Sequence, residues 1–319
     1  MIKLTEPYVG IEETEAVRRV FESGWLAEGP KTLLFEQAIA EYTGADYAVA
    51  VSNATVGLEL CLRANKIKGY VATSAFGHPA TVRAIVNAGC MPLFVDVSLK
   101  TYNIDCSKEI LSVDAYMPVS WGGNPNYVIT FDGSPVIVDA SCSLGAGFNY
   151  GDGTQVFSLH PRKLITTGEG GVVTTNSREV AESIRSLKNF GYTNAKFDDI
   201  RAAIGIEQLK KLPQIIKWRI GMAEVYDDLL RDVDGVVVPE PSLGHVYQTY
   251  AVYIKDANRD RIIKEFRRKH IETQVGAYAL SEEAPNALLL GDHLLALPMS
   301  YTMTSADQKR VVDTLKAML

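Results

Sequence analysis

The sequence predicts a layered α/β fold with a largely parallel sheet, followed by a small α+β domain. Short apolar runs such as Tyr47–Val51 (YAVAV) are typical of strands buried on both faces. These runs alternate with amphipathic segments, as in layered α/β domains with parallel strands. The chain has 319 residues, and a domain usually has about 150. We therefore expect a large domain over residues 1–214 and a small domain over residues 215–319.

Composition and charge favour a cytoplasmic enzyme. The chain is 47% hydrophobic and 22% charged, as in proteins with a sizeable core. A net charge of -6 argues against nucleic acid or an acidic membrane as a partner. No apolar run reaches the roughly 18 residues of a membrane span, and the N-terminus lacks signal-peptide features. The four cysteines show no CxxC pairing, so we expect reduced thiols and no metal site.

The elements of the large domain follow from periodicity, glycines and prolines. We predict helices at residues 12–21, 31–42, 56–64, 79–88 and 178–190 and one ending near residue 212, and strands at 47–51, 70–73, 91–95, 115–120, 135–138, 155–158 and 172–175. Ligands gather at the carboxyl ends of such strands. Residues 52–55, residues 75–78 and Asp139 are expected there.

The small domain is predicted to follow a break at Pro213. A long helix over residues 215–230 bridges to it. A strand at 247–254 and helices at 259–270 and 306–318 complete it.

A strand–turn–helix at Ser52-Asn53-Ala54-Thr55 offers a place for a phosphate. Small residues at a helix N-terminus leave backbone N–H groups exposed at the positive end of the helix dipole. The same residues are also typical of an ordinary N-cap. The local pattern alone favours the N-cap over a phosphate site.

Lys163 lies in the stretch FSLHPRKLITTGEGG, which connects two β-prone runs. One interpretation is a solvated loop residue. The other is an amine in a partly dry pocket, with a lowered pKa, that forms a Schiff base with a carbonyl compound.

Asp139 ends an apolar strand and precedes a run of small residues. It either caps the following turn or pairs with a protonated ring nitrogen. Pyridoxal phosphate requires a lysine, such a carboxylate and a phosphate cradle.

The order of several motifs resembles the DegT/StrS family of sugar aminotransferases. These motifs are WLAEGP, FEQAIAEYTGADYAVAVSNAT, AGCMPLFVDVSLKTYNID, VIVDASCSLGA, FSLHPRKLITTGEGGVVTTN and AAIGIEQLKKL. The serine five residues before the lysine, with GEGG after it, is the most specific feature. The resemblance covers almost the whole chain. It implies a three-layer, mostly parallel large domain of the pyridoxal-phosphate-dependent transferase fold type I, with pyridoxal 5′-phosphate as the cofactor.

The resemblance also implies roles for individual residues. Lys163 matches the lysine of the internal aldimine, and Asp139 matches the aspartate that keeps the pyridine nitrogen protonated. The other matched positions are Asn53, Ala54, Thr55 and Ser158 at the phosphate, His78 where an aromatic usually stacks on the ring, and Asn194 reaching into a neighbouring subunit's site. The sequence departs from the family at Cys142, which replaces a glutamine or histidine, and at Lys196, which replaces an arginine.

The implied activity is ping-pong transamination from L-glutamate or L-glutamine to a nucleotide-linked keto-sugar by a homodimer with shared active sites. The alternatives are dehydration of a sugar, transamination of a non-sugar ketone, or a binding protein that kept the fold without activity. Family members with histidine in place of the lysine are dehydratases, so Lys163 favours transamination. Residues 122–135 and 274–293 are short for the family, which predicts an open pocket with Tyr278 and residues 24–30 in its wall.

Overall fold

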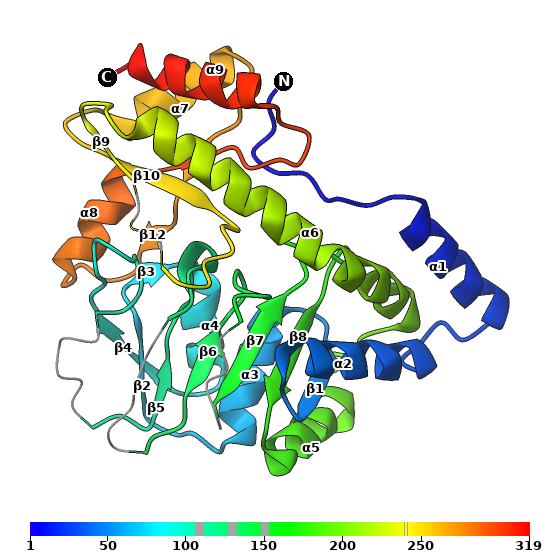
Figure 1. Cartoon of the computed structure of the whole chain (residues 1–319). Coiled ribbons are helices and arrows are strands. Elements are labelled where there is room, and N and C mark those ends of the chain that lie inside the picture. Colours follow the sequence, from blue (N-terminus) through cyan, green and yellow to red (C-terminus); the bar gives the residue numbers. More distant parts are fainter. Residues whose placement is uncertain (106–111, 127–132, 148–152, 239, 241) are drawn as a thin grey trace.

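The computed structural model describes residues 1–105, 112–126, 133–147, 153–238, 240 and 242–319. Within these ranges, a large mixed sheet has helices on both faces, and a smaller sheet lies with the C-terminal helices (Figure 1). The strands of the large sheet are β1 (Tyr47–Val51), β2 (Tyr70–Ser74), β4 (Met91–Val95), β5 (Ala115–Met117), β6 (Ile137–Asp139), β7 (Thr154–Ser158) and β8 (Gly171–Thr175). The helices packed around it are α2 (Pro30–Thr43), α3 (Ala54–Ala64), α4 (Pro79–Asn87), α5 (Arg178–Ser186) and the first half of α6 (Asp199–Leu230). The helix α1 (Ile11–Ser23) packs on α6, and the chain also forms the 3₁₀ turn η1 (Trp121–Gly123) and the π-helical turn η2 (Leu187–Gly191).

The described strands of the large sheet run in one direction except β8. Their order is β1-β8-β7-β6 on one side and β5-β2-β4 on the other, joined by parallel bridges such as that between Tyr116 and Val136. Both neighbours of β8 are antiparallel to it, and the other pairs are parallel. The mostly parallel sheet is therefore confirmed, and β8 starts at the edge where its neighbours end.

Alternate residues of the same strands are buried on opposite faces. Val49 and Val51 pack with α3, α4 and α5, whereas Ala48 and Ala50 pack with α2 and α6. The pleat of a strand sends successive side chains to opposite faces. Both faces of the sheet are therefore covered by helices, which gives the three layers expected.

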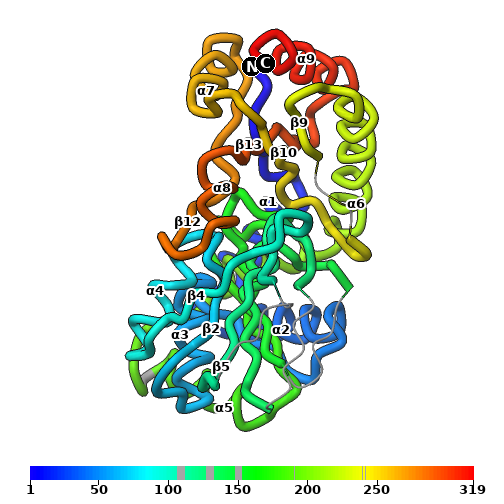
Figure 2. Tube along the Cα trace, turned by 90° about the vertical axis from the view of Figure 1, so that its left-hand side faces the viewer, coloured from blue at the N-terminus to red at the C-terminus, as the bar shows by residue number. Residues whose placement is uncertain are grey.

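The smaller sheet is antiparallel, with the order β11-β13-β10-β9. Its strands and helices are β9 (Val236–Val237), β10 (Tyr250–Ile254), β11 (Gln274–Val275), β13 (Leu294–Leu297), α7 (Arg259–Arg268), α8 (Pro285–His293) and α9 (Ser305–Lys316). Ile2 from the N-terminus is buried in the same core and bridges to Ile271. The two chain ends consequently lie close together beside α9 (Figure 2).

The predicted break at Pro213 is wrong, because α6 runs through it as one helix of 32 residues. An interior proline loses a backbone hydrogen bond and costs about 3 kcal/mol or more. Leu209, Leu212 and Ile215 are buried on both sides of the proline, and their packing offsets this cost. The predicted domain boundary at residue 214 falls inside this helix and stays a prediction.

Other predicted elements differ at their ends. The strand predicted at 115–120 ends at Met117, the helix predicted at 178–190 becomes a π-helical turn after Ser186, and the strand predicted at 247–254 starts at Tyr250. Tyr247 has a φ of 47°, a left-handed conformation that no strand accommodates. The expected short connection over residues 122–135 lies partly outside the described residues.

Across the described ranges, no helix combines the length and apolar character needed to cross a membrane. Nor do three or more His, Cys, Asp or Glu side chains gather there as metal ligands would.

Candidate active site

Three strand ends meet in one row at the carboxyl edge of the large sheet. Gly171, the first residue of β8, pairs with Val51 at the end of β1 and with Ser158 at the end of β7. This row forms because β8 runs against its neighbours, so that its start lies beside their ends. Ser158 and the turn after Val51, which were both predicted as phosphate contacts, are thereby brought together.

The turn after β1 leads directly into α3. Asn53 is the N-cap, and its side-chain oxygen accepts a hydrogen bond of 3.0 Å from the Val56 backbone N–H. Ala54 and Thr55 follow as the first two helical residues, whose N–H groups have no partner within a helix. The N-cap interpretation is therefore confirmed, whereas the phosphate site stays a prediction that the free N–H groups of the first turn of α3 are compatible with.

Gly171 allows this helix end to approach the sheet closely. A Cβ atom on Gly171 would lie 2.6 Å from the Ala54 nitrogen and 2.7 Å from the Asn53 carbonyl carbon. Real Cβ atoms are not found at such distances from backbone, so the last glycine of GEGG sets the position of the α3 N-terminus.

Asp139 is a buried carboxylate at the end of β6. Its side chain accepts a hydrogen bond of 2.6 Å from the Thr81 hydroxyl and one of 3.1 Å from the Ser141 backbone N–H. A carboxylate can accept about four hydrogen bonds, so Asp139 retains capacity for a further donor. The bond from Ser141 also shows the turn that the sequence suggested as an alternative role.

Lys163 lies in the connection between β7 and β8, which folds back as a hairpin. Leu159 donates to Gly170 and Thr167 donates to Leu159 across this connection. The Lys163 amine donates a hydrogen bond of 3.1 Å to the Cys142 sulfur. Lys163 thus points toward the turn that follows Asp139, and the interpretation as a freely solvated residue is wrong.

Competing influences set the pKa of Lys163. Burial lowers it, whereas the charge of Cys142, the hydrogen bond to Cys142 and the charge of Asp139 raise it, and the net pKa is raised above its usual value. The predicted lowering of this pKa is wrong for the chain itself, because desolvation is outweighed by these neighbours.

His78 is the N-cap of α4, and its Nδ1 accepts a hydrogen bond of 3.2 Å from Ala80. Burial and the nearby Lys163 charge lower the pKa of His78, and Asp139 opposes them. His78, Lys163 and Asp139 therefore come from three different segments to one place.

Tyr278 of β12 (Tyr278–Ala279) pairs with Gly77 of β3 (Phe76–Gly77), so its backbone lies next to His78. Tyr278 itself is 51% exposed.

Asn194 is exposed at the surface, and its predicted contact with a neighbouring subunit stays a prediction. The next residue, Ala195, accepts a hydrogen bond from the Ser52 backbone, so this segment lies against the turn after β1 of its own chain.

Residues 24–30 are held by Asp199, which accepts a hydrogen bond from the Gly29 backbone, and by the buried Lys188, which pairs with Glu28. Their place in a pocket wall stays a prediction.

Two contacts of the site were missed at the sequence level. Thr81, which holds Asp139, lies in the first turn of α4, three residues after His78, and that spacing is its only signal. Gln248 donates a hydrogen bond of 2.8 Å to the Arg162 carbonyl next to Lys163. No local pattern marks Gln248, because it lies far away in the sequence.

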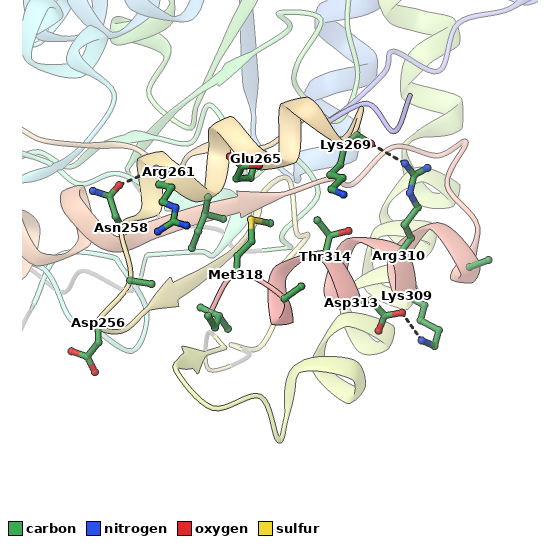
Figure 3. A pocket seen from close by; sticks show the side chains of 15 residues that line it. Asp256, Asn258, Arg261, Glu265, Lys269, Lys309, Arg310, Asp313, Thr314 and Met318 are labelled. Atoms are coloured by element: carbon green, nitrogen blue, oxygen red, sulfur yellow. Dashed lines mark hydrogen bonds and ion pairs between the residues drawn. The ribbon is translucent and has the colours of Figure 1, made fainter.

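A cavity of about 940 Å³ lies elsewhere, between α7 and α9 (Figure 3). Arg261, Glu265, Lys269 and Arg310 are among its lining residues. None of the predicted site residues lines this cavity, so it is separate from the site around Lys163.

Residues 7–316 match the DegT/DnrJ/EryC1/StrS aminotransferase family. Uncharacterized protein MJ1066 of Methanocaldococcus jannaschii is 30% identical, with 98% of this chain and 96% of that protein covered. Among solved structures, Spr1654 of Streptococcus pneumoniae in its PMP form is 20% identical, with a TM-score of 0.91, and 100% of this chain and 99% of that chain are covered. DesI, solved in the presence of its TDP-sugar product, is 26% identical, with a TM-score of 0.89. The match covers 99% of this chain and 92% of that chain.

Proposed function

Because the chain belongs to the DegT/DnrJ/EryC1/StrS aminotransferase family, we propose that it transfers an amino group from glutamate or glutamine to a nucleotide-linked keto-sugar. The chain is an aminotransferase, and pyridoxal phosphate is the cofactor of this family. One observation carries the proposal: the Lys163 amine contacts Cys142, three residues after the buried Asp139, at the sheet edge where Ser158, Gly171 and the start of α3 meet. The TDP-sugar product of the related DesI supports a nucleotide-linked acceptor.

The residues present fit pyridoxal phosphate. The close approach at Gly171 brings the α3 N-terminus, with its positive dipole end, to the sheet edge where a phosphate is stabilised. A buried carboxylate needs a cationic or donating partner, and Asp139 has capacity for one. When bound, the cofactor supplies a ring that withdraws electrons from the carbon bearing the substrate's nitrogen.

Each residue then has a task of its own. Asp139 holds a proton on the ring nitrogen, and Thr81 and Ser141 fix the orientation of its carboxylate. The Lys163 amine would hold the cofactor covalently and, when free, would move a proton to and from the reacting carbon. Ser158 and the first turn of α3 would hold the phosphate and so keep the ring in place.

The first test locates the cofactor. The purified protein is expected to be yellow, and borohydride reduction followed by peptide mapping should place the adduct on Lys163. The Lys163→Ala variant should give no adduct, whereas Lys188→Arg, a change at a lysine that pairs with Glu28 instead, should leave the adduct in place. An adduct on another lysine would overturn the assignment.

The second test identifies the substrates. The loss of cofactor absorbance is followed with glutamate or glutamine as donor and with a panel of nucleotide-linked keto-sugars that differ at one hydroxyl. Turnover of several panel members at comparable rates is expected, because an open pocket places few polar groups to read each hydroxyl. A single member turned over far faster would contradict the open pocket. Reaction of simple keto acids alone would overturn the sugar assignment.

A further inference from the structure

We propose that Cys142 is a positioning residue for Lys163: its sulfur holds the free amine at the sheet edge whenever the amine does not carry the cofactor. The inference rests on the proposed role of Lys163. Cys142 occupies a position at which the family resemblance led us to expect glutamine or histidine, so a thiol there is a property of this chain. The observation that carries the inference is the hydrogen bond of 3.1 Å from the Lys163 amine to the Cys142 sulfur.

The backbone around Cys142 is fixed. Ser141 donates to the Asp139 side chain at 3.1 Å, and Ser143 donates to the Ala140 carbonyl at 2.9 Å, so the chain turns tightly after β6. A Cβ on Gly123 would lie 3.0 Å from the Cys142 carbonyl oxygen, which shows that a second segment packs on this turn. The turn therefore fixes the backbone from which the Cys142 sulfur reaches the Lys163 amine.

The backbone around Lys163 is fixed as well. Its N–H donates to the His160 carbonyl at 2.9 Å, and Gln248 donates to the neighbouring Arg162 carbonyl at 2.8 Å. Both partners of the contact thus stand on backbone with its own hydrogen bonds. A long lysine side chain loses considerable rotamer freedom when it is held in place, and a sulfur acceptor at a fixed position compensates part of that loss.

The contact also determines which acceptor the amine approaches. Asp139 and His78 face Lys163 from β6 and α4, and the buried Arg219 of α6 acts electrostatically on Cys142. An amine bound directly to Asp139 would occupy the carboxylate that the ring nitrogen needs. With Cys142 as its acceptor, Lys163 stays beside the turn that follows Asp139, and the Asp139 carboxylate remains available.

The geometry can be tested without any enzymatic activity. o-Phthalaldehyde joins an amine and a thiol that lie within bonding reach into a fluorescent isoindole, with release of water. In full-length protein freed of cofactor, an isoindole linking Lys163 and Cys142 is expected by fluorescence and peptide mapping. It should be absent from Cys142→Ala and from the cofactor-loaded protein, and present in Cys90→Ala, which alters a buried cysteine outside the site. An unlinked pair in the unmodified chain would overturn the proposal.

The functional consequence is tested by the pH dependence of cofactor uptake. Attack on the cofactor's aldehyde requires the neutral amine, and Cys142 raises the pKa of that amine. The midpoint of the uptake rate should therefore move to lower pH in Cys142→Ala, with Cys142→Ser between the two. In the loaded enzyme, kcat should fall about tenfold with KM nearly unchanged. An unchanged midpoint, or a loss in KM alone, would refute a positioning role, whereas failure of sugar turnover in all variants would count against the proposed function instead.

Discussion

The close packing at Gly171 leads to a specific prediction for Gly171→Ala. The added Cβ would meet three backbone atoms, at 2.6, 2.7 and 3.0 Å, in Asn53 and Ala54. Backbone cannot rotate away as a side chain does, so the start of α3 must move off the sheet by some tenths of an ångström. Gly171 does not have a positive φ, so alanine brings no backbone strain of its own.

The expected loss of stability follows from these contacts. Overpacking of this kind destabilises the folded chain by about 1–3 kcal/mol. Alanine also lowers the conformational entropy of the unfolded chain, which stabilises the fold by about 0.4–1 kcal/mol. A net destabilisation of about 1–2 kcal/mol is therefore expected. The displaced N–H groups should also weaken cofactor binding about tenfold, which corresponds to about 1.4 kcal/mol.

Urea unfolding of the cofactor-free chain measures the first effect, and titration with pyridoxal phosphate measures the second. Gly221→Ala is the matched control, because a Cβ there meets nothing within 4 Å in α6 and should stabilise the helix by about 0.5–1 kcal/mol. If Gly171→Ala kept both its unfolding midpoint and its cofactor affinity, the close approach at this strand end would not position the helix.

Three further predictions concern charge and assembly. Asp139→Asn should keep its circular dichroism spectrum and lose turnover by about 100-fold or more, since an amide cannot hold the ring proton; turnover near that of the unmodified chain would leave Asp139 a turn residue only. Mixing Asn194→Ala with Lys163→Ala chains should restore activity through hybrid dimers with one intact site, and confirmed hybrids without activity would argue against shared sites. Hydrogen bonds from Lys3, Thr302 and Ser300 lower the pKa of Glu6 from 4.5 to about 2. The Glu6 carboxylate therefore contributes its full stability above pH 4.5 and loses that contribution as the pH falls toward 2. Glu6→Gln should consequently lose less stability than the unmodified chain between these two pH values, as measured by acid unfolding.

The large sheet was predictable because its strands are short apolar runs. Tyr47–Val51 reads as buried on both faces, and the structure shows alternate residues packed into two cores. The positions of Asn53, His78 and Asp139 at the carboxyl edge follow from the same alternation of strands and helices. Their convergence follows from sheet topology, which local spacing does not contain.

Other features depend on contacts between distant segments. Pro213 is a local signal to end a helix, and only the burial of Leu212 and Ile215 shows why the helix continues. The helix Pro285–His293 was not predicted, although Pro285 suits a first helical position, and its N-terminus is held by Asp96 from far away in the sequence. The raised pKa of Lys163 likewise depends on Cys142, a partner that only the fold supplies.

The uninterrupted course of α6 limits how the molecule can move. Its Leu209 and Ile215 belong to the core of the large sheet, whereas Ala223 and Tyr226 belong to that of the smaller one. A hinge normally uses a few loop or terminal residues, yet this junction is a helical rod whose 32 residues extend about 48 Å. Bending it would break backbone hydrogen bonds of the helix and separate side chains that are packed in the two cores. Access for a large substrate is thus expected to come from displacement of surface segments or from sliding of packed side chains, with both sheets travelling as one body.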